Sequence, residues 1–233
     1  MIIIRDLCFT YPDGRTVLHH ISFTVSAGES VGFIGANGAG KTTLFLCLCG
    51  VHTVPRGCIR LRDCDPADAQ QRQQLPRHVG IVFQNSDEQL FSATVFDDVA
   101  FGPLNLELPP EEVRQRVADA LQVVHMTGSE QRVPFHLSGG EKRRIALAGV
   151  LAMKPSILVL DEPSLFLDPR SRRGLIHLIN ELPDTKLIAS HDLALVRETC
   201  QRVLLLDEGQ LIVDGPTHEV LGNHELLQRY GLE

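Results

Sequence analysis

Residues 35–43 read G-A-N-G-A-G-K-T-T and decide the fold of this chain. They fit the phosphate-binding loop pattern GxxxxGK[ST]. A compact apolar strand is expected just before them, at residues 30–34, and residues 44–48 continue as an apolar helix. In this strand–loop–helix order, the backbone N–H groups of the loop and the positive end of the helix face an anion. The context therefore favours a phosphate-binding loop over a glycine-rich turn that matches the pattern by chance.

The residue types inside this loop suit a chain of phosphates. Glycines let successive N–H groups turn toward one point. Lys41 is expected to reach the terminal phosphates, and the hydroxyl of Thr42 is expected to ligate magnesium. The residues predicted to hold the phosphates are Gly35, Asn37, Gly38, Gly40, Lys41, Thr42 and Thr43.

A second stretch, I-L-V-L-D-E-P at residues 157–163, predicts a buried strand that ends in two acids. Open α/β sheets bind their ligands at the carboxyl ends of the strands. We expect Asp161 to hold magnesium and Glu162 to polarise an attacking water. Pro163 cannot continue the ladder, so the strand ends there. Two acids in a solvated loop are the alternative, which the phosphate loop makes less favourable.

Composition narrows the class of protein. The chain has 233 residues, of which 43% are hydrophobic and 22% charged, and its formal net charge is −7. These values are ordinary for a globular protein, and the negative charge argues against a nucleic-acid partner. No apolar run approaches the ~18 residues of a membrane span, and the start M-I-I-I-R-D lacks the features of a signal peptide. Six cysteines without a CxxC pair favour reduced thiols over a metal or disulfide site.

Strands and helices alternate along much of the chain. The first third carries short β-prone runs, and a helical block follows in which Pro110 occupies the first turn of one helix. A second helix is expected from about Gly139 to Met153. The last third returns to apolar runs separated by helices, at residues 156–160, 186–189 and 202–206. Strands separated by helices imply a parallel sheet that is covered on both faces, so the predicted fold class is α/β.

A third stretch, L-S-G-G-E at residues 137–141, has two interpretations. Ser138 and Glu141 have the spacing of a capping box, which explains them as the start of a helix. That interpretation does not explain Gly139 and Gly140, whose adjacent amides are left open to an anion. Together with the two preceding motifs, this stretch resembles the ATP-binding cassette (ABC) ATPases, and the motifs occur in that family's order.

The resemblance covers nearly the whole chain. It implies a P-loop NTPase core with a mainly parallel sheet, an N-terminal antiparallel β subdomain and an inserted helical subdomain. We expect one nucleotide-binding domain over residues 1–233, with residues 84–154 as the helical subdomain and residues 1–83 and 155–233 as the rest. The cofactors implied are ATP and Mg²⁺.

The resemblance also assigns roles to single residues. Tyr11 matches the aromatic residue that stacks on adenine, although an ordinary strand aromatic is an equal alternative. His191 follows a strand and matches the histidine that contacts the γ-phosphate, although a lone histidine is more often structural.

In the family, the segment matched by Ser138, Gly139, Gly140 and Glu141 closes over the phosphate loop of another subunit. This chain has one copy of each motif, so the resemblance implies that it pairs with itself or with a close relative when ATP is bound. Leu167-Asp168 matches the end of the loop that crosses to that partner. The sequence departs from the family's pattern at Leu165 and Phe166, where relatives carry small residues, and this bears on how the two sites communicate.

The stretch V-F-Q-N-S-D-E-Q-L-F, which begins at Val82, gives a finer resemblance. In the family, the glutamine matched by Gln84 reaches the magnesium and the water. With residues 97–103, the stretch is similar to the ATPase subunits of energy-coupling-factor importers, especially those for cobalt and nickel. It implies a transmembrane coupling protein with basic helices that meet Asp87 and Glu88, a separate substrate-binding membrane protein, and a place at the cytoplasmic face of the membrane. The alternatives are an acidic solvated loop, and a vitamin such as biotin as the solute.

Two rival functions are weighed against an importer subunit. One is an ABC ATPase that moves no solute, such as a translation or DNA-repair member, which the length and the unbroken motif spacing do not suit. The other is a regulatory module that binds ATP without hydrolysing it. Glu162, Gln84 and His191 are all present, which argues against that second rival.

Overall fold

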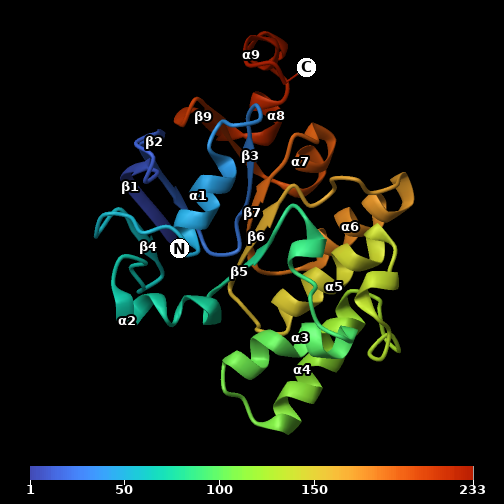
Figure 1. The fold of residues 1–233 in the computed structure, drawn as a ribbon. Helices are drawn as coiled ribbons and strands as arrows, with labels where there is room; N and C mark the ends of the chain where they lie inside the picture. Colours follow the sequence, from blue (N-terminus) through green and yellow to red (C-terminus); the bar gives the residue numbers. More distant parts are fainter. Residues whose placement is uncertain (233) are drawn as a thin grey trace.

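Two β-sheets form the frame of the computed structural model, which describes residues 1–232 (Figure 1). The smaller sheet is antiparallel and has the strand order β2-β1-β4. Ile2 pairs with Val25 on one side and with Leu61 on the other, which fixes the register of β1. The antiparallel β subdomain expected from the resemblance is therefore present. Its strands are β1 (Ile2–Thr10), β2 (Thr16–Val25) and β4 (Ile59–Leu61).

The larger sheet has six strands in the order β5-β6-β7-β3-β8-β9. The first five are parallel, and β9 runs antiparallel to β8 at the edge. This mainly parallel sheet confirms the predicted α/β class. Its strands are β3 (Ser30–Ile34), β5 (Val79–Val82), β6 (Ile157–Asp161), β7 (Thr185–Ala189), β8 (Arg202–Asp207) and β9 (Gln210–Pro216).

Helices cover both faces of the larger sheet (Figure 1). On β6, Ile157 and Val159 face the core that contains α1 and the antiparallel sheet. Leu158 and Leu160 face the core that contains α3 to α7. This alternation along a fully buried strand is expected of a sheet with a layer on each side. The helices are α1 (Lys41–Leu48), α2 (Ala69–Arg72), α3 (Val95–Asn105), α4 (Pro110–Val123), α5 (Gly139–Leu151), α6 (Pro169–Glu181), α7 (Leu193–Thr199), α8 (Thr217–Val220) and α9 (His224–Arg229), with 3₁₀ turns η1 (Leu75–Arg77), η2 (Ser86–Glu88) and η3 (Pro134–His136).

Helices α3, α4 and α5 form a lobe at the end of the molecule away from the C-terminus (Figure 1). α4 begins at Pro110, where the sequence places a first-turn proline followed by two glutamates. α5 begins at Gly139 and ends at Leu151, two residues before the predicted end. The limits 84–154 for a separate helical subdomain remain a prediction. Among residues 1–232, no helix combines the length and the apolar character needed to cross a membrane.

Candidate active site

The glycine-rich loop joins β3 to α1 and has a backbone that only glycine suits at two points. Gly35 has φ 152°, and a Cβ there would lie 2.2 Å from the carbonyl oxygen of Leu206. Gly40 has φ 100° and is the N-cap of α1, without a side chain to cap the helix. The first-turn N–H groups of α1 are thereby left for another acceptor, which is the arrangement that binds phosphate.

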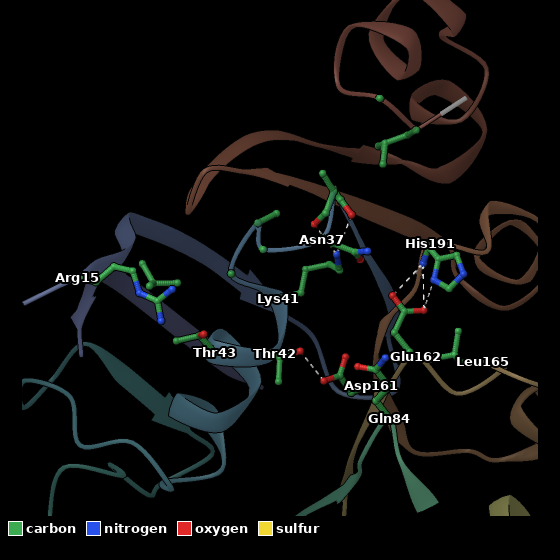
Figure 2. A pocket seen from close by; sticks show the side chains of 18 of the residues that line it. Arg15, Asn37, Lys41, Thr42, Thr43, Gln84, Asp161, Glu162, Leu165 and His191 are labelled. Carbon is green, nitrogen blue, oxygen red and sulfur yellow. Dashed lines mark hydrogen bonds and ion pairs between the residues drawn. The ribbon is translucent and has the colours of Figure 1, made fainter. Parts of the chain in front are cut away.

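An open pocket of about 920 Å³ surrounds this loop (Figure 2). The carboxyl end of β6 supplies Asp161 and Glu162, and the segments after β5 and β7 supply Gln84 and His191. Residues far apart in sequence therefore meet at one edge of the sheet, as expected for parallel strands. The other lining residues are Tyr11, Arg15, Val17, Gly35, Ala36, Asn37, Gly38, Ala39, Gly40, Lys41, Thr42, Thr43, Leu165, Gly231 and Leu232.

Lys41 is closed onto its own loop. Its Nζ donates to the carbonyl oxygens of Gly35 at 2.7 Å and Ala36 at 3.1 Å, and the residue is 7% exposed. Burial lowers the pKa of Lys41, while the nearby carboxylates of Glu162 and Asp161 act in the opposite direction. To bind a phosphate, the ammonium group exchanges these carbonyl acceptors for phosphate oxygens within the same pocket.

Asp161 has the features of a cation ligand. Its Oδ2 accepts a hydrogen bond of 2.7 Å from the Thr42 hydroxyl, and its Oδ1 is buried without a hydrogen-bond partner. Burial raises the pKa of Asp161, so an adjacent cation would stabilise the carboxylate form. The Thr42 hydroxyl, Asp161 and the amide of Gln84 are oxygen donors of the kind that Mg²⁺ prefers, so these residues fit that ion.

Glu162 is held tightly at the end of β6. Its Oε2 lies 2.7 Å from Nδ1 of His191 and accepts from the Ser190 hydroxyl at 3.2 Å, and its Oε1 accepts from the backbone N–H of His191 at 3.1 Å. Its backbone is left-handed, with φ 46°, and its N–H donates to the carbonyl of Ala189. A glutamate in this region is strained, and the contacts from the β7 end hold it there.

Tyr11 lies at the side of the pocket. Its hydroxyl is 3.1 Å from the hydroxyl of Thr43, and its ring packs edge-on against Phe9 and His52. The guanidinium of Arg15 lies 5.3 Å from the centre of the Tyr11 ring. A base that stacks on this face of the ring would meet or displace Arg15, and adenine stacking on Tyr11 stays a prediction.

The predicted capping box is present at the start of α5. The Ser138 hydroxyl accepts from the backbone N–H of Glu141, and the Glu141 carboxylate accepts from the backbone N–H of Ser138 at 2.8 Å. Arg132 binds the same carboxylate at 2.6 Å and is the first cause that lowers the pKa of Glu141 to about 2. Ser138 and Gly139 are exposed, and none of Ser138, Gly139, Gly140 and Glu141 lines the pocket around the phosphate loop.

The loop after β5 has internal partners that the sequence did not indicate. Lys142 of α5 forms an ion pair of 2.6 Å with Asp87, and Glu88 accepts a hydrogen bond from the side chain of Asn85. The expectation that Asp87 awaits a basic partner outside the chain is therefore incomplete. The Asp87 side chain remains 66% exposed, so a second contact is sterically open to it.

The segment after Pro163 carries the departure from the family pattern. Phe166 is 93% exposed and has φ 61°, in the left-handed region that a phenylalanine rarely adopts. Leu165 lines the phosphate-loop pocket, and Asp168 caps α6 by accepting from the N–H groups of Arg170 and Ser171.

Sequence reasoning missed three arginines. Arg15 lines the pocket, Arg132 binds Glu141, and Arg143 donates to backbone carbonyls at Phe83 and Gln84. No motif marks any of them. For Arg132 the sequence offers one signal, which is Glu141 at the third helical position of the capping box, because such a carboxylate favours a nearby cation.

Comparison with known proteins places these features in a family. The ABC transporter family model matches residues 18–165. A chain from Geobacter sulfurreducens, named provisionally as an ABC transporter ATP-binding protein, is 52% identical over 230 residues, which are 99% of this chain and 92% of that one. The energy-coupling factor transporter ATP-binding protein EcfA of Methanothermobacter thermautotrophicus is 48% identical, over 100% of this chain and 76% of its own. The solved structure of cbiO1 from Clostridium perfringens, described as part of the ABC transporter complex cbiONQ, is 35% identical with a TM-score of 0.86, covering 100% of this chain and 94% of that one.

Proposed function

The chain belongs to the ABC transporter family and is an ATPase, and on this premise we propose that it is the ATP-hydrolysing subunit of a membrane importer. The observation that carries the hydrolytic part is the meeting of three features in one pocket. These are the phosphate loop, the unpartnered buried oxygen of Asp161, and the firmly held carboxylate of Glu162.

In this proposal Glu162 accepts the proton of the attacking water. Its carboxylate lies at the pocket wall, and its contacts with the backbone N–H and the ring of His191 fix its direction. Lys41 and the loop amides hold the phosphates, and His191 turns toward the γ-phosphate from its present position beside Glu162. His191 has room to do so because its side chain is 56% exposed.

Thr42, Asp161 and Gln84 are proposed to hold Mg²⁺. When bound there, the ion would neutralise charge on the β- and γ-phosphates and shield the buried carboxylate of Asp161. The Thr42 hydroxyl donates to Asp161 at 2.7 Å, so these two oxygen donors already lie side by side.

We propose that the complete site needs two chains. None of Ser138, Gly139, Gly140 and Glu141 lines the phosphate-loop pocket; Gly139 borders an adjoining cavity with Thr42, Gln84 and Asp161, and Ser138 and Gly139 are exposed. A second copy or a close relative, related by a two-fold axis, would bring this segment over the phosphate loop and would receive the same in return.

The importer subtype is proposed as energy-coupling factor, with cobalt or nickel ion as the solute and a vitamin such as biotin as the alternative. The name of the EcfA relative supports the energy-coupling-factor subtype, and the description of cbiO1 as part of an ABC transporter complex supports assembly with other subunits. The choice of solute rests on the resemblance of the stretch that begins at Val82. The membrane partners would be a transmembrane coupling protein and a substrate-binding protein, with this chain on the cytoplasmic face. The exposed acids of the loop after Gln84 suit a basic docking segment.

Three measurements test the proposal. The purified chain should hydrolyse ATP with Mg²⁺, and EDTA should abolish the activity. A tagged chain expressed with its neighbouring genes should copurify a membrane protein, and cells should take up radioactive cobalt or nickel only when the chain is intact. If the chain hydrolyses ATP but no membrane protein copurifies with it, the ATPase assignment stands and the proposal of an importer subunit is rejected.

A further inference from the structure

The loop that carries Gln84 is fastened to α5 by a buried arginine. Arg143 is 4% exposed, and its two terminal nitrogens each donate a hydrogen bond of 2.6 Å, one to the carbonyl oxygen of Phe83 and one to that of Gln84. A planar guanidinium suits this task because its two N–H groups point in fixed, nearly parallel directions. The contact therefore fixes both the position and the orientation of two consecutive peptide groups.

The burial of this charge is costly, which argues that the contact has a purpose beyond filling space. Within residues 1–232 no carboxylate lies within ion-pair distance of Arg143, although the carboxylate of Asp161 acts on it at longer range and opposes the effect of burial, which lowers its pKa. Its Nε is buried without a hydrogen-bond partner. An apolar side chain would fill the same volume without that desolvation. It would, however, leave the carbonyls of Phe83 and Gln84 without their donors.

The loop held by Arg143 is itself a closed unit. The Gln89 side chain accepts from the backbone N–H of Phe83 at 3.2 Å and donates to the carbonyl of Ile81 at 3.1 Å. Lys142, the neighbour of Arg143, binds Asp87 at 2.6 Å on the exposed side of the loop. Two consecutive residues of α5 therefore hold this loop, Arg143 at Phe83 and Gln84 and Lys142 at Asp87.

That part of α5 lies close to Ser138, which caps the helix. We propose that Arg143 is a positioning residue for hydrolysis, which makes Gln84 and Ser138 move as one body. This inference rests on the proposed function, in which Gln84 serves the ATP of its own chain and Ser138 serves the ATP of the partner. Displacement of one segment would then displace the other, and this gives each chain a direct mechanical link between the two ATP sites.

The test compares Arg143→Met with Arg143→Lys. We expect Arg143→Met to bind a fluorescent ATP analogue in the absence of Mg²⁺ as the parental chain does, because Arg143 lies outside the phosphate-loop pocket and borders only the adjoining cavity with Thr42, Gln84 and Asp161. Its kcat should fall by about 10–100-fold, since a misplacement of about 1 Å has effects of this size. Amide hydrogen exchange in residues 83–89 should become faster. Arg143→Lys should recover part of both losses, because an ammonium group still donates to one carbonyl. Arg143→Lys keeps the positive charge that acts on Asp161, so a recovery of kcat without any recovery of amide exchange would assign the loss to charge and not to positioning.

Arg116→Met is the matched control. Arg116 also donates from its guanidinium to two consecutive carbonyls, those of Ala152 and Met153, within the same helical lobe. Its replacement should leave kcat and the exchange of residues 83–89 unchanged. Arg143→Gln, which keeps an amide donor, gives the same two readouts where the methionine variant does not fold.

Two further outcomes would overturn the inference. One is an Arg143→Met chain with parental kcat and parental exchange, and the other is a loss of kcat with no change in the exchange of residues 83–89. Failure of the proposed function would appear differently, as a parental chain that does not hydrolyse ATP. Amide hydrogen exchange of residues 83–89 in the parental and Arg143→Met chains could still be compared in that case.

Discussion

Replacing Glu162 by glutamine should separate hydrolysis from binding. The amide oxygen can still accept from the backbone N–H of His191, and the amide NH₂ can donate to the Ser190 hydroxyl, so the geometry at the end of β6 is kept. What is lost is the group that accepts a proton from water. We expect kcat to fall by ~10²–10⁴-fold, which corresponds to about 3–5 kcal/mol in the activation free energy.

The free energy of unfolding should change by no more than about 1 kcal/mol, because one set of hydrogen bonds replaces another of similar number. ATP binding should persist, since Lys41, Thr42 and Asp161 are untouched. The measurements are steady-state phosphate release, titration with a fluorescent nucleotide, and light scattering for an ATP-dependent dimer that persists longer than that of the parental chain.

Glu208→Gln is the control for this experiment. Glu208 also has a left-handed backbone, with φ 42°, and is exposed outside the phosphate-loop pocket. Its replacement tests whether the loss of a glutamate charge at such a backbone is enough to slow turnover. Parental hydrolysis by the Glu162→Gln chain would show that another group accepts the proton.

Three further predictions concern assembly, docking and acid stability. A Ser138→Ala chain mixed with a Lys41→Ala chain should hydrolyse ATP faster than either chain alone, because one of the two sites in each mixed dimer keeps both Lys41 and Ser138. Equal or lower rates, or an active monomer, would count against composite sites. Reversal of Asp87 and Glu88 to lysine should release the membrane partner but not the nucleotide, and adding Lys142→Asp, which restores the internal ion pair, should not restore copurification if the acids face that partner. The folded pKa of Glu141 is about 2, below its ordinary 4.5, so the stabilisation from its ionised form is present above pH 4.5 and is lost as the pH falls toward 2. Arg132→Gln should reduce this pH dependence of the denaturation midpoint. An unchanged profile would show that Arg132 is not its cause.

The elements that sequence reasoning predicted are those specified by local patterns. The strand at Ser30–Ile34, the start of α4 at Pro110 and the capping box of Ser138 each depend on residues within a few positions of one another. The edge strand β9 was missed. Its residues alternate between exposed and partly buried, and it follows β8 through a turn at Glu208 and Gly209 that the sequence displays as D-E-G-Q.

The long-range polar contacts could not be predicted in the same way. Arg143 meets carbonyls about sixty positions earlier, and any backbone offers such carbonyls, so the sequence carries no signal of the pairing. Lys142 and Asp87 are an ordinary cation and anion among many on this chain. Their pairing follows from the packing of α5 against the end of β5, which is a property of the whole fold.

The two glycines that follow Ser138 have different physical causes. A Cβ on Gly140 would lie 2.6 Å from the hydroxyl oxygen of Ser171, in the first turn of α6, so packing inside the chain accounts for its missing side chain. A Cβ on Gly139 would meet nothing within 4 Å, and this residue is exposed at the start of α5. No neighbour within residues 1–232 needs the space that a side chain would take at this first helical position. Open access to the backbone N–H groups at the start of a helix suits an anion, and in the proposed dimer that anion would be the phosphate chain held by the partner's loop.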